Sequence, residues 1–202
     1  SARGLHRGAQ PPRVVHVGGY SGGEAPRGSW YEPRMVVRSR APLRLSFAGG
    51  GTDVAPFPET EGGAVLSATI DRYAYGSLTP RADQRICVHS LDLGVSLDFD
   101  ARDEPSFDGS LDLVKAAVRR LGGDGAGPGS GFDLLLRSSA PPGSGLGSSS
   151  TMLVALVGLL REHHRLPLTD YEVAELAYQA ERVDLRIRGG HHDATAGLRV
   201  AR

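Results

Sequence analysis

The stretch PPGSGLGSSS, residues Pro141 to Ser150, decides how the rest of this chain is interpreted. It contains three glycines and four serines, carries no charge, and is followed at once by the apolar run TMLVALVGLL. The pattern FDLLLRS before it predicts a strand, and the apolar run predicts a helix from about Ser148 to His164. From the loop alone, two interpretations are open: a linker or ordinary helix-capping loop, or a loop whose backbone amides wrap an anion. Its position between a strand and a strongly apolar helix favours the second.

A glycine-rich loop directly before a helix suits a phosphate group. Free backbone amides and the positive end of the helix dipole meet there, and glycines let the backbone approach closely and adopt positive φ. The serine hydroxyls can bind phosphate or reach a metal ion. Two common phosphate-binding patterns are nevertheless missing. The P-loop needs a lysine, and none occurs between Lys115 and Arg202. The dinucleotide pattern fails because the pair Gly145 and Gly147 is followed by three serines.

Composition restricts the class of protein. The 202 residues, 40% of them hydrophobic, are enough for one good-sized domain. Equal numbers of basic and acidic residues, 23 of each, argue against a general nucleic-acid binder. The single cysteine excludes an internal disulfide and favours a reducing compartment. The longest apolar run, Met152 to Leu160, is shorter than the ~20 residues that cross a bilayer. We therefore predict a cytoplasmic protein that binds neither nucleic acid nor membrane.

The chain divides into two parts by composition. Residues 1–34 hold seven glycines, four prolines and five arginines, and we expect them to be disordered or a non-native extension. From Met35 the pattern becomes regular, and we expect residues 35–202 to form one domain. In PLRLSF, the alternation of Leu43, Leu45 and Phe47 predicts a half-buried strand, and AGGGTD predicts a turn after it. AVLSATI, YAYGSL, RICVHSL and VSLDF predict further strands.

Two more helices are indicated by apolar spacing. LDLVKAAVRRL places Leu111, Val114, Ala117, Val118 and Leu121 at helical spacing, and Gly122-Gly123 end that helix. In LTDYEVAELAYQAERVDL, Thr169 and Glu172 fit a capping box. The buried stripe of this helix is predicted to be Val173, Leu176, Ala177, Ala180 and Val183. Strands first, then mixed strands and helices, predict an α+β fold of two layers with the helices on one face of the sheet.

Two further segments join the loop in a pattern that resembles a known enzyme family. APLRLSFAGGGTD (41–53), PPGSGLGSSS and AERVDLRIRGGHHD (180–193) occur in this order. Together they resemble the GHMP kinases, which include galactokinase and the homoserine, mevalonate and phosphomevalonate kinases. The sequence is most similar to the branch of D-glycero-D-manno-heptose 7-phosphate kinases and related sugar 1-kinases, which also carry a strand like GGAVLSATID (62–71). The resemblance covers about Met35 to Gly197 and implies a sheet-and-helix fold like that of a ribosomal protein domain.

The resemblance implies an ATP-dependent kinase that uses Mg²⁺. Ser149 and Glu181 would hold the metal ion. On an ideal helix Glu181 lies about 80° from Val173, at the border of the buried stripe; the alternative is a surface carboxylate that pairs with Arg182. The nucleotide loop would consist of Pro142, Gly143, Ser144, Gly145, Leu146, Gly147, Ser148 and Ser149.

The same resemblance implies roles around the acceptor hydroxyl. Asp193 matches the catalytic aspartate that takes or orients the hydroxyl proton, and Arg44 matches a basic residue that neutralises developing charge. The implied substrate is a small sugar or sugar phosphate, phosphorylated on its anomeric hydroxyl if it is a heptose 7-phosphate; the sequence assigns no oligomeric state. The residues implied to contact the sugar are Gly49, Gly50, Gly51, Thr52 and Asp53.

Two departures from the family pattern affect these expectations. Around Asp193 the heptose kinases read Lys-Gln-Asp-Gln-Tyr, whereas this chain reads HHDATAG. Family members also continue with a second half that completes both sites. We therefore expect residues 35–202 to be a truncated N-terminal, ATP-binding domain without the C-terminal domain, with apolar surface exposed where that half docks. The alternatives are a relic that binds nucleotide without catalysis, and an RNA-contacting protein, against which neutral charge and scarce lysine weigh.

Overall fold

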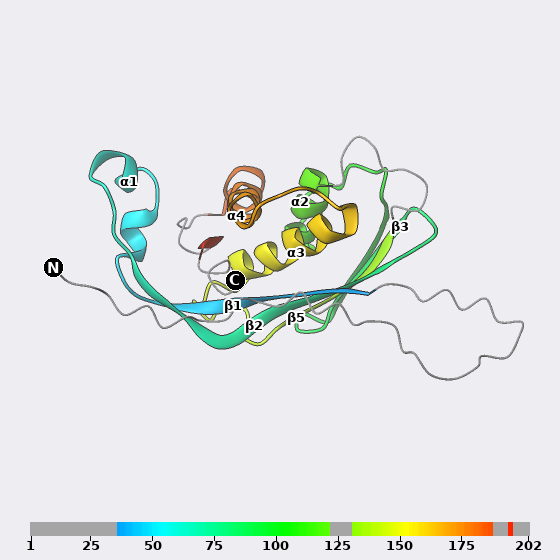
Figure 1. Cartoon of the computed structure of the whole chain (residues 1–202), viewed down its shortest axis with the longest axis horizontal. Helices are drawn as coiled ribbons and strands as arrows, with labels where there is room; N and C mark the ends of the chain where they lie inside the picture. The colour runs from blue at the N-terminus through cyan, green and yellow to red at the C-terminus, as the bar shows by residue number, and fades with distance from the viewer. Residues whose placement is uncertain (1–35, 122–130, 188–193, 196–202) are drawn as a thin grey trace, which may run out of the picture.

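The computed structural model describes residues 36–121, 131–187 and 194–195 as a two-layer α+β fold. One layer is a five-stranded sheet with the order β1-β2-β5-β3-β4, antiparallel except for the β3–β5 pair. Helices α2, α3 and α4 lie on one face of this sheet (Figure 1). The predicted fold class is confirmed. The predictions for residues 1–34 and for Gly122-Gly123 lie outside the described residues.

The strands match the sequence patterns with one difference. AVLSATI and YAYGSL predict two strands, but they form the single long strand β2. The strands are β1 (Val37–Ala48), β2 (Leu66–Pro80), β3 (Arg85–Ser90), β4 (Val95–Asp100) and β5 (Phe132–Ser138). The helices are the 3-10 turn η1 (Gly50–Asp53), α1 (Phe57–Thr60), α2 (Asp112–Leu121), α3 (Ser148–His164), α4 (Asp170–Gln179) and the π-helical turn η2 (Ala180–Asp184).

Helix α3 is the centre of the core and begins and ends where the apolar run predicts. It packs on β1 and β2 and also contacts α2 and α4. Its side chains are buried around most of the circumference, and Leu153, Leu156 and Leu159 are no more than 1% exposed. The Ser39 hydroxyl of β1 donates to the Ala155 carbonyl of α3 at 2.9 Å. Among the described residues, no helix is both long and apolar enough to cross a membrane.

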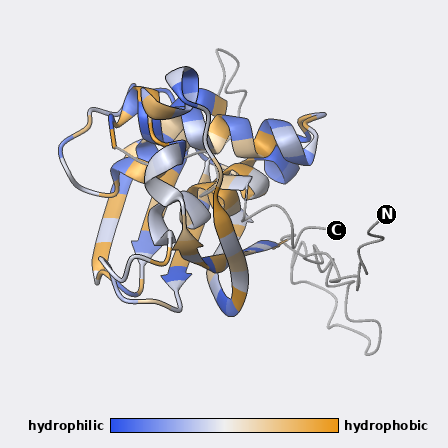
Figure 2. Cartoon of the chain, turned by 90° about the vertical axis from the view of Figure 1, so that its left-hand side faces the viewer, coloured by the Kyte–Doolittle hydropathy of each residue, from blue (hydrophilic) through white to orange (hydrophobic). Residues whose placement is uncertain are grey.

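Strand β1 departs from the predicted alternation at its C-terminal end. Leu43 is fully buried, but Leu45 and Phe47 are 41% and 63% exposed, so the prediction that all three face the core is wrong. Arg44, predicted on the solvent side, is buried. The strand runs past the end of α3, and no described helix covers its last residues. Figure 2 views the molecule from this end.

Helix α4 starts as predicted but does not continue as an ideal α-helix. The Thr169 side chain accepts from the Glu172 amide, and the Glu172 carboxylate accepts from the Thr169 amide, so the capping box is confirmed. After Gln179 the chain widens into η2, where the Leu185 amide donates to the Ala180 carbonyl five residues back. This changes the phase of the side chains. Val183, predicted in the buried stripe, is 64% exposed.

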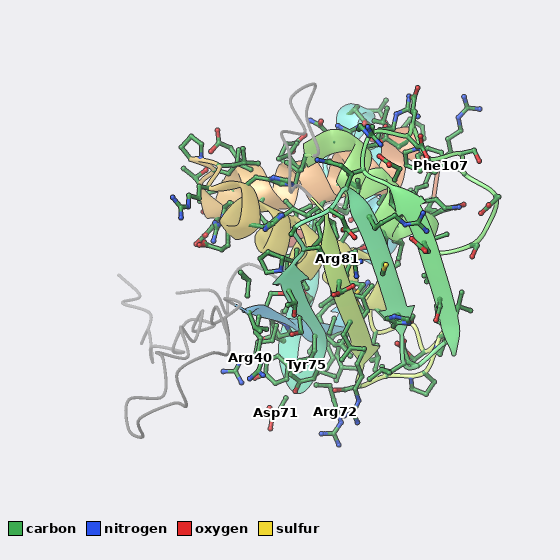
Figure 3. The ribbon with its side chains drawn as sticks, turned by 90° about the vertical axis from the view of Figure 1, so that its right-hand side faces the viewer. Arg40, Asp71, Arg72, Tyr75, Arg81 and Phe107 are labelled. Atoms are coloured by element: carbon green, nitrogen blue, oxygen red, sulfur yellow. The ribbon has the colours of Figure 1, made fainter. Side chains whose placement is uncertain are left out.

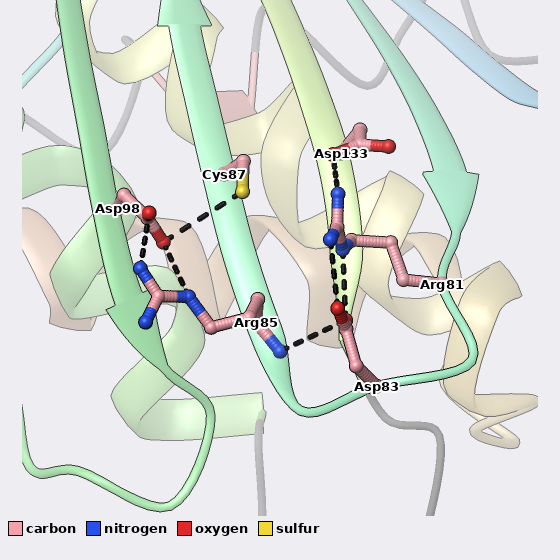
Figure 4. A network of polar contacts seen from close by, with 6 residues as sticks. All are labelled: Arg81, Asp83, Arg85, Cys87, Asp98 and Asp133. Atoms are coloured by element: carbon pink, nitrogen blue, oxygen red, sulfur yellow. Dashed lines mark hydrogen bonds and ion pairs between the residues drawn. The ribbon is translucent and has the colours of Figure 1, made fainter.

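The face of the sheet away from the helices carries a network of ion pairs at the β2–β3 turn (Figure 4). The Arg81 guanidinium donates to both Asp83 oxygens at 2.7 and 2.8 Å and to Asp133 at 2.7 Å. The hydrogen bonds from the Arg81 guanidinium, and after them the bond from the Arg85 backbone amide, lower the pKa of Asp83 to about 2. Arg85 pairs in the same way with Asp98 across β3 and β4.

We predict that the Arg81 network stabilises the fold in a pH-dependent way. Because Asp83 has a depressed pKa, its contribution is complete above the ordinary value of 3.8 and is lost as pH falls towards about 2. Arg81→Met should therefore lower the melting temperature at neutral pH, and the difference from wild type should shrink across that window. Thermal unfolding followed by circular dichroism at a series of pH values measures this difference in melting temperature. The control is Arg137→Met, because no described carboxylate pairs with Arg137; an Arg81→Met deficit independent of pH would contradict the prediction.

Candidate active site

The loop between β5 and α3 is shaped by three glycines in the left-handed region. Gly143, Gly145 and Gly147 have φ values of 75°, 71° and 72°. A side chain at Gly143 or Gly145 would enter open space, whereas a Cβ at Gly147 would lie 3.2 Å from the Arg44 Cζ atom. Turns with left-handed residues direct successive backbone N–H groups inward and create concave anion-binding sites. The predicted nucleotide loop therefore has the backbone geometry that its composition suggests.

The loop leads directly into the N-terminus of α3. Gly147 is the N-cap and offers no side-chain acceptor to the first-turn amides, and the first turn holds no acidic residue. The first intrahelical bond runs from the Thr151 amide to the Gly147 carbonyl at 2.9 Å. The amides before it and the positive end of the helix dipole therefore point towards the loop.

Arg44 fastens this loop to strand β1. Its side chain donates to the Gly145 carbonyl at 2.9 Å, and its backbone amide donates to the Leu146 carbonyl at 3.2 Å. The residue is only 8% exposed, although it is charged. The structure thus gives Arg44 a contact with the nucleotide loop that sequence reasoning did not foresee. Its assignment to the acceptor hydroxyl stays a prediction.

Glu181 is a buried carboxylate on the first turn of η2. It is 2% exposed, so the alternative of a surface carboxylate is wrong, although the Arg182 guanidinium does lie 3.6 Å from its Oε2 atom. The Ser149 hydroxyl donates to Oε1 at 2.7 Å, and the Ser150 hydroxyl donates to Oε2 at 2.5 Å. Ser149 and Glu181, the predicted metal pair, therefore lie in contact. Ser150 was not predicted; its only sequence signal is the run of three serines.

These oxygens suit a hard divalent cation. Mg²⁺ is commonly held by one or two carboxylates together with phosphate oxygens and water, rather than by a full protein cage. In the part of the chain that the structure describes, no three His, Cys, Asp or Glu side chains form a metal-binding group. Glu181 and Ser149 could hold Mg²⁺ together with phosphate oxygens of a ligand and water.

A cleft of about 770 Å³ lies beside the loop. Arg44 and the loop glycines line it, with Ser148 and Ser149, and so do the carboxylates of Asp92, Asp112 and Asp184. Apolar residues make up much of the remaining lining, which suits a ligand with both charged and apolar parts. Its apolar residues are Leu93, Phe107, Leu111, Leu113, Val114, Leu136, Met152, Leu185 and Ile187.

The residues predicted to bind sugar form a separate turn. Gly49–Asp53 follow β1 as η1 and do not line the cleft. The Thr52 hydroxyl donates to the Gly49 carbonyl at 2.8 Å and accepts from the Ala64 amide at 3.1 Å. A Cβ at Gly49 would lie 1.8 Å from the Ala64 carbonyl oxygen, so only glycine fits there. The predicted catalytic residue Asp193 lies outside the described residues.

The site is thus defined by a glycine-rich loop without lysine, which joins strand β5 to the central helix α3 of a two-layer α+β fold. Residues 112–199 match the model of the GHMP kinases N terminal domain. This stretch of the chain is therefore a GHMP kinase N-terminal domain.

Individual relatives agree with this family. The chain is 39% identical over 161 residues to the D-glycero-alpha-D-manno-heptose 7-phosphate kinase of Campylobacter jejuni, covering 80% of this chain and 48% of that protein. It matches the crystal structure of a D-glycero-D-manno-heptose 1-phosphate kinase from Bacteriodes thetaiotaomicron with a TM-score of 0.74 and 39% identity, over 81% of this chain and 53% of the other. Lactococcus lactis galactokinase in complex with galactose matches with a TM-score of 0.68 and 27% identity, over 80% and 41%. The chain thus spans about half the length of these relatives.

We predict that the Arg44 contact makes Gly147 the least replaceable glycine of the loop. Gly145→Ala introduces only the strain of a left-handed alanine, which costs about 1–2 kcal/mol. Gly147→Ala adds the close approach to the guanidinium and should destabilise the protein further. Urea unfolding of both variants measures the difference, and Gly143→Ala is a second open-space control. Equal losses at Gly145 and Gly147 would show that Arg44 does not restrict the loop.

Proposed function

We propose that this chain is the nucleotide-binding part of a sugar kinase, which transfers the terminal phosphoryl group of ATP to a sugar hydroxyl. The acceptor is the anomeric hydroxyl of a heptose 7-phosphate or a related sugar. The observation that carries the proposal is the Gly143–Ser149 loop, with its left-handed glycines and its serine contact to buried Glu181. The 39% identity to a heptose 7-phosphate kinase supports the substrate class.

The phosphates of ATP would lie in the loop, with the nucleoside against the apolar residues of the cleft. Backbone amides and the α3 N-terminus supply the positive potential that a lysine supplies in P-loop enzymes. Ser149 and Glu181 would hold Mg²⁺, which supplies charge neutralisation at the phosphate oxygens when bound. Arg44 keeps the loop closed against β1 by its bond to the Gly145 carbonyl.

The transfer step needs positioning and one proton acceptor. The sugar hydroxyl oxygen forms a bond to the γ-phosphorus while the bond from that phosphorus to the bridging oxygen of ADP breaks. The hydroxyl proton passes to the Asp193 carboxylate in this scheme, and Gly49–Asp53 contact the sugar. Asp193 has the sequence position of the family aspartate and lies outside the described residues.

We further propose that a second half, as long as that of the relatives, docks on the uncovered end of β1 and β2. Leu45 and Phe47 lie on alternate positions of β1, and Leu66 lies on β2 opposite Ala48. All three hydrophobic side chains are at least 41% exposed. Apolar side chains gathered at one end of a sheet are typical of a covered interface.

The proposed activity is tested by a coupled assay for ADP release with heptose 7-phosphate and Mg–ATP. The 202-residue chain and the Campylobacter jejuni kinase are assayed side by side, with galactose as a second acceptor. We expect heptose-dependent turnover by the relative and much slower turnover by this chain, because the docking half completes the site. Turnover by the relative alone, with nucleotide still bound by this chain, would support the alternative of a non-catalytic nucleotide-binding module. Failure of this chain to bind nucleotide at all would contradict the proposal.

We predict that Glu181→Gln removes the Mg²⁺ dependence of nucleotide binding. The substitution keeps the side-chain volume and can still hydrogen-bond Ser149 and Ser150, but it removes the anionic oxygen. Binding of ATP should weaken at least about tenfold in Mg²⁺ and change little in EDTA. Isothermal titration calorimetry measures both. Asp193→Asn, placed by the proposal at the acceptor and not at the metal, is the contrast and should bind Mg–ATP normally. Unchanged Mg²⁺ dependence in Glu181→Gln would remove Glu181 from the metal site.

A further inference from the structure

Lys115 is the only lysine of the chain, and its charge is buried. The side chain lies in the second turn of α2 and is 4% exposed. Its ammonium donates to Asp108 Oδ1 at 2.5 Å and to Asp112 Oδ1 at 3.4 Å. A buried ammonium is stable only when it is paired, so this cluster has a defined geometry.

The two aspartates hold the loop that precedes α2. Asp112 accepts from the Gly109 amide at 2.8 Å and from the Asp108 amide at 3.2 Å. Asp108 accepts from the Ser110 amide at 2.9 Å. The carboxylates thus bind three consecutive backbone amides, and Lys115 joins the two carboxylates to each other.

The same loop contains a strained residue. Leu111 has a φ of 51°, in the left-handed region that residues other than glycine rarely adopt. Its carbonyl accepts from the amides of Val114 and Lys115 at 2.9 and 3.3 Å. A strained residue persists only where its surroundings fix it, and such residues gather at binding sites. The Lys115 cluster supplies that fixation.

This loop is also a wall of the cleft. Phe107, Gly109 and Leu111 line it. The Arg119 guanidinium, one turn beyond Lys115, lies 5.8 Å from the centre of the Phe107 ring and supports it from outside. Figure 3 shows Phe107 beside the helices, far from Arg40 and Tyr75 at the other end of the view. The strained loop therefore contributes apolar side chains to the same cleft that the Gly143–Ser149 loop lines.

We propose that Lys115 is a positioning residue for the nucleoside end of the cleft. Through Asp108 and Asp112 it fixes the 107–111 loop, so that Phe107 and Leu111 form a preformed wall for a base. The inference rests on the proposed nucleotide binding, and it separates two parts of that binding. The phosphate loop acts on the triphosphate, whereas the Lys115 cluster acts only on the nucleoside.

Binding of ATP and of inorganic triphosphate, each with Mg²⁺, tests the proposal by calorimetry. Asp108→Asn breaks the shorter ion pair at a side chain that is 57% exposed, so the fold is expected to persist. The variant should bind ATP about tenfold more weakly, as expected for one lost charge-assisted hydrogen bond, and should bind inorganic triphosphate like wild type. The matched control is Asp100→Asn, which breaks an exposed pair with Arg102 outside the cleft and should change neither affinity.

The single lysine gives a second readout that does not depend on affinity. An N-hydroxysuccinimide acetate reagent, followed by peptide mass spectrometry, reports acylation of Lys115 apart from the N-terminal amine. Acylation should be slow in the wild type, slower still with ATP, and several-fold faster in Asp108→Asn, because the ammonium reacts only when the loop opens.

Two results for Asp108→Asn would overturn the positioning role and leave nucleotide binding unaffected. One is an equal loss of affinity for ATP and for triphosphate, and the other is an unchanged ATP affinity with faster acylation. A wild type that binds neither ligand would overturn the proposed function itself.

Discussion

The buried carboxylate of Glu181 is the contact on which the site depends. Removing a carboxylate from water costs several kcal/mol unless hydrogen-bond donors replace the solvent. The donors here are the hydroxyls of Ser149 and Ser150, at the start of α3, and Arg182 lies beside them. The pairing fixes η2 against α3, while Arg44 fixes the loop against β1. A loop without lysine is thereby held between two charged side chains that keep its backbone amides in place.

Much of the architecture follows from local patterns in the sequence. The apolar run after Gly147 predicts α3 with its correct bounds. It also predicts that α3 is buried, because a helix that is apolar on most sides must lie in the core. The capping box at Thr169 sets the start of α4 by hydrogen bonds between near neighbours. The glycine spacing of the loop likewise predicts left-handed turns. In these cases the information lies within a few residues of the structure that it determines.

The remaining features depend on contacts between distant segments. The position of Glu181 follows from a π-helical turn, which a pattern of 3.6 residues per turn cannot represent, so Val183 was assigned to the wrong face. The exposure of Leu45 and Phe47 depends on where α3 ends above the sheet. The contact of Arg44 with Gly145 joins residues that are 101 positions apart. No periodic signal marks the burial of Lys115 beside Asp108, because its partners come from an irregular loop.

The central claim is that main-chain nitrogens of the β5–α3 loop bind the phosphates of ATP. Amide NMR of the ¹⁵N-labelled chain, titrated with a non-hydrolysable ATP analogue and Mg²⁺, tests it most directly. The account predicts saturable shifts concentrated at Gly143–Ser149 and at the first turn of α3, with smaller shifts at the apolar residues that line the cleft. Saturable shifts confined to other parts of the domain, with these amides unmoved, would contradict it.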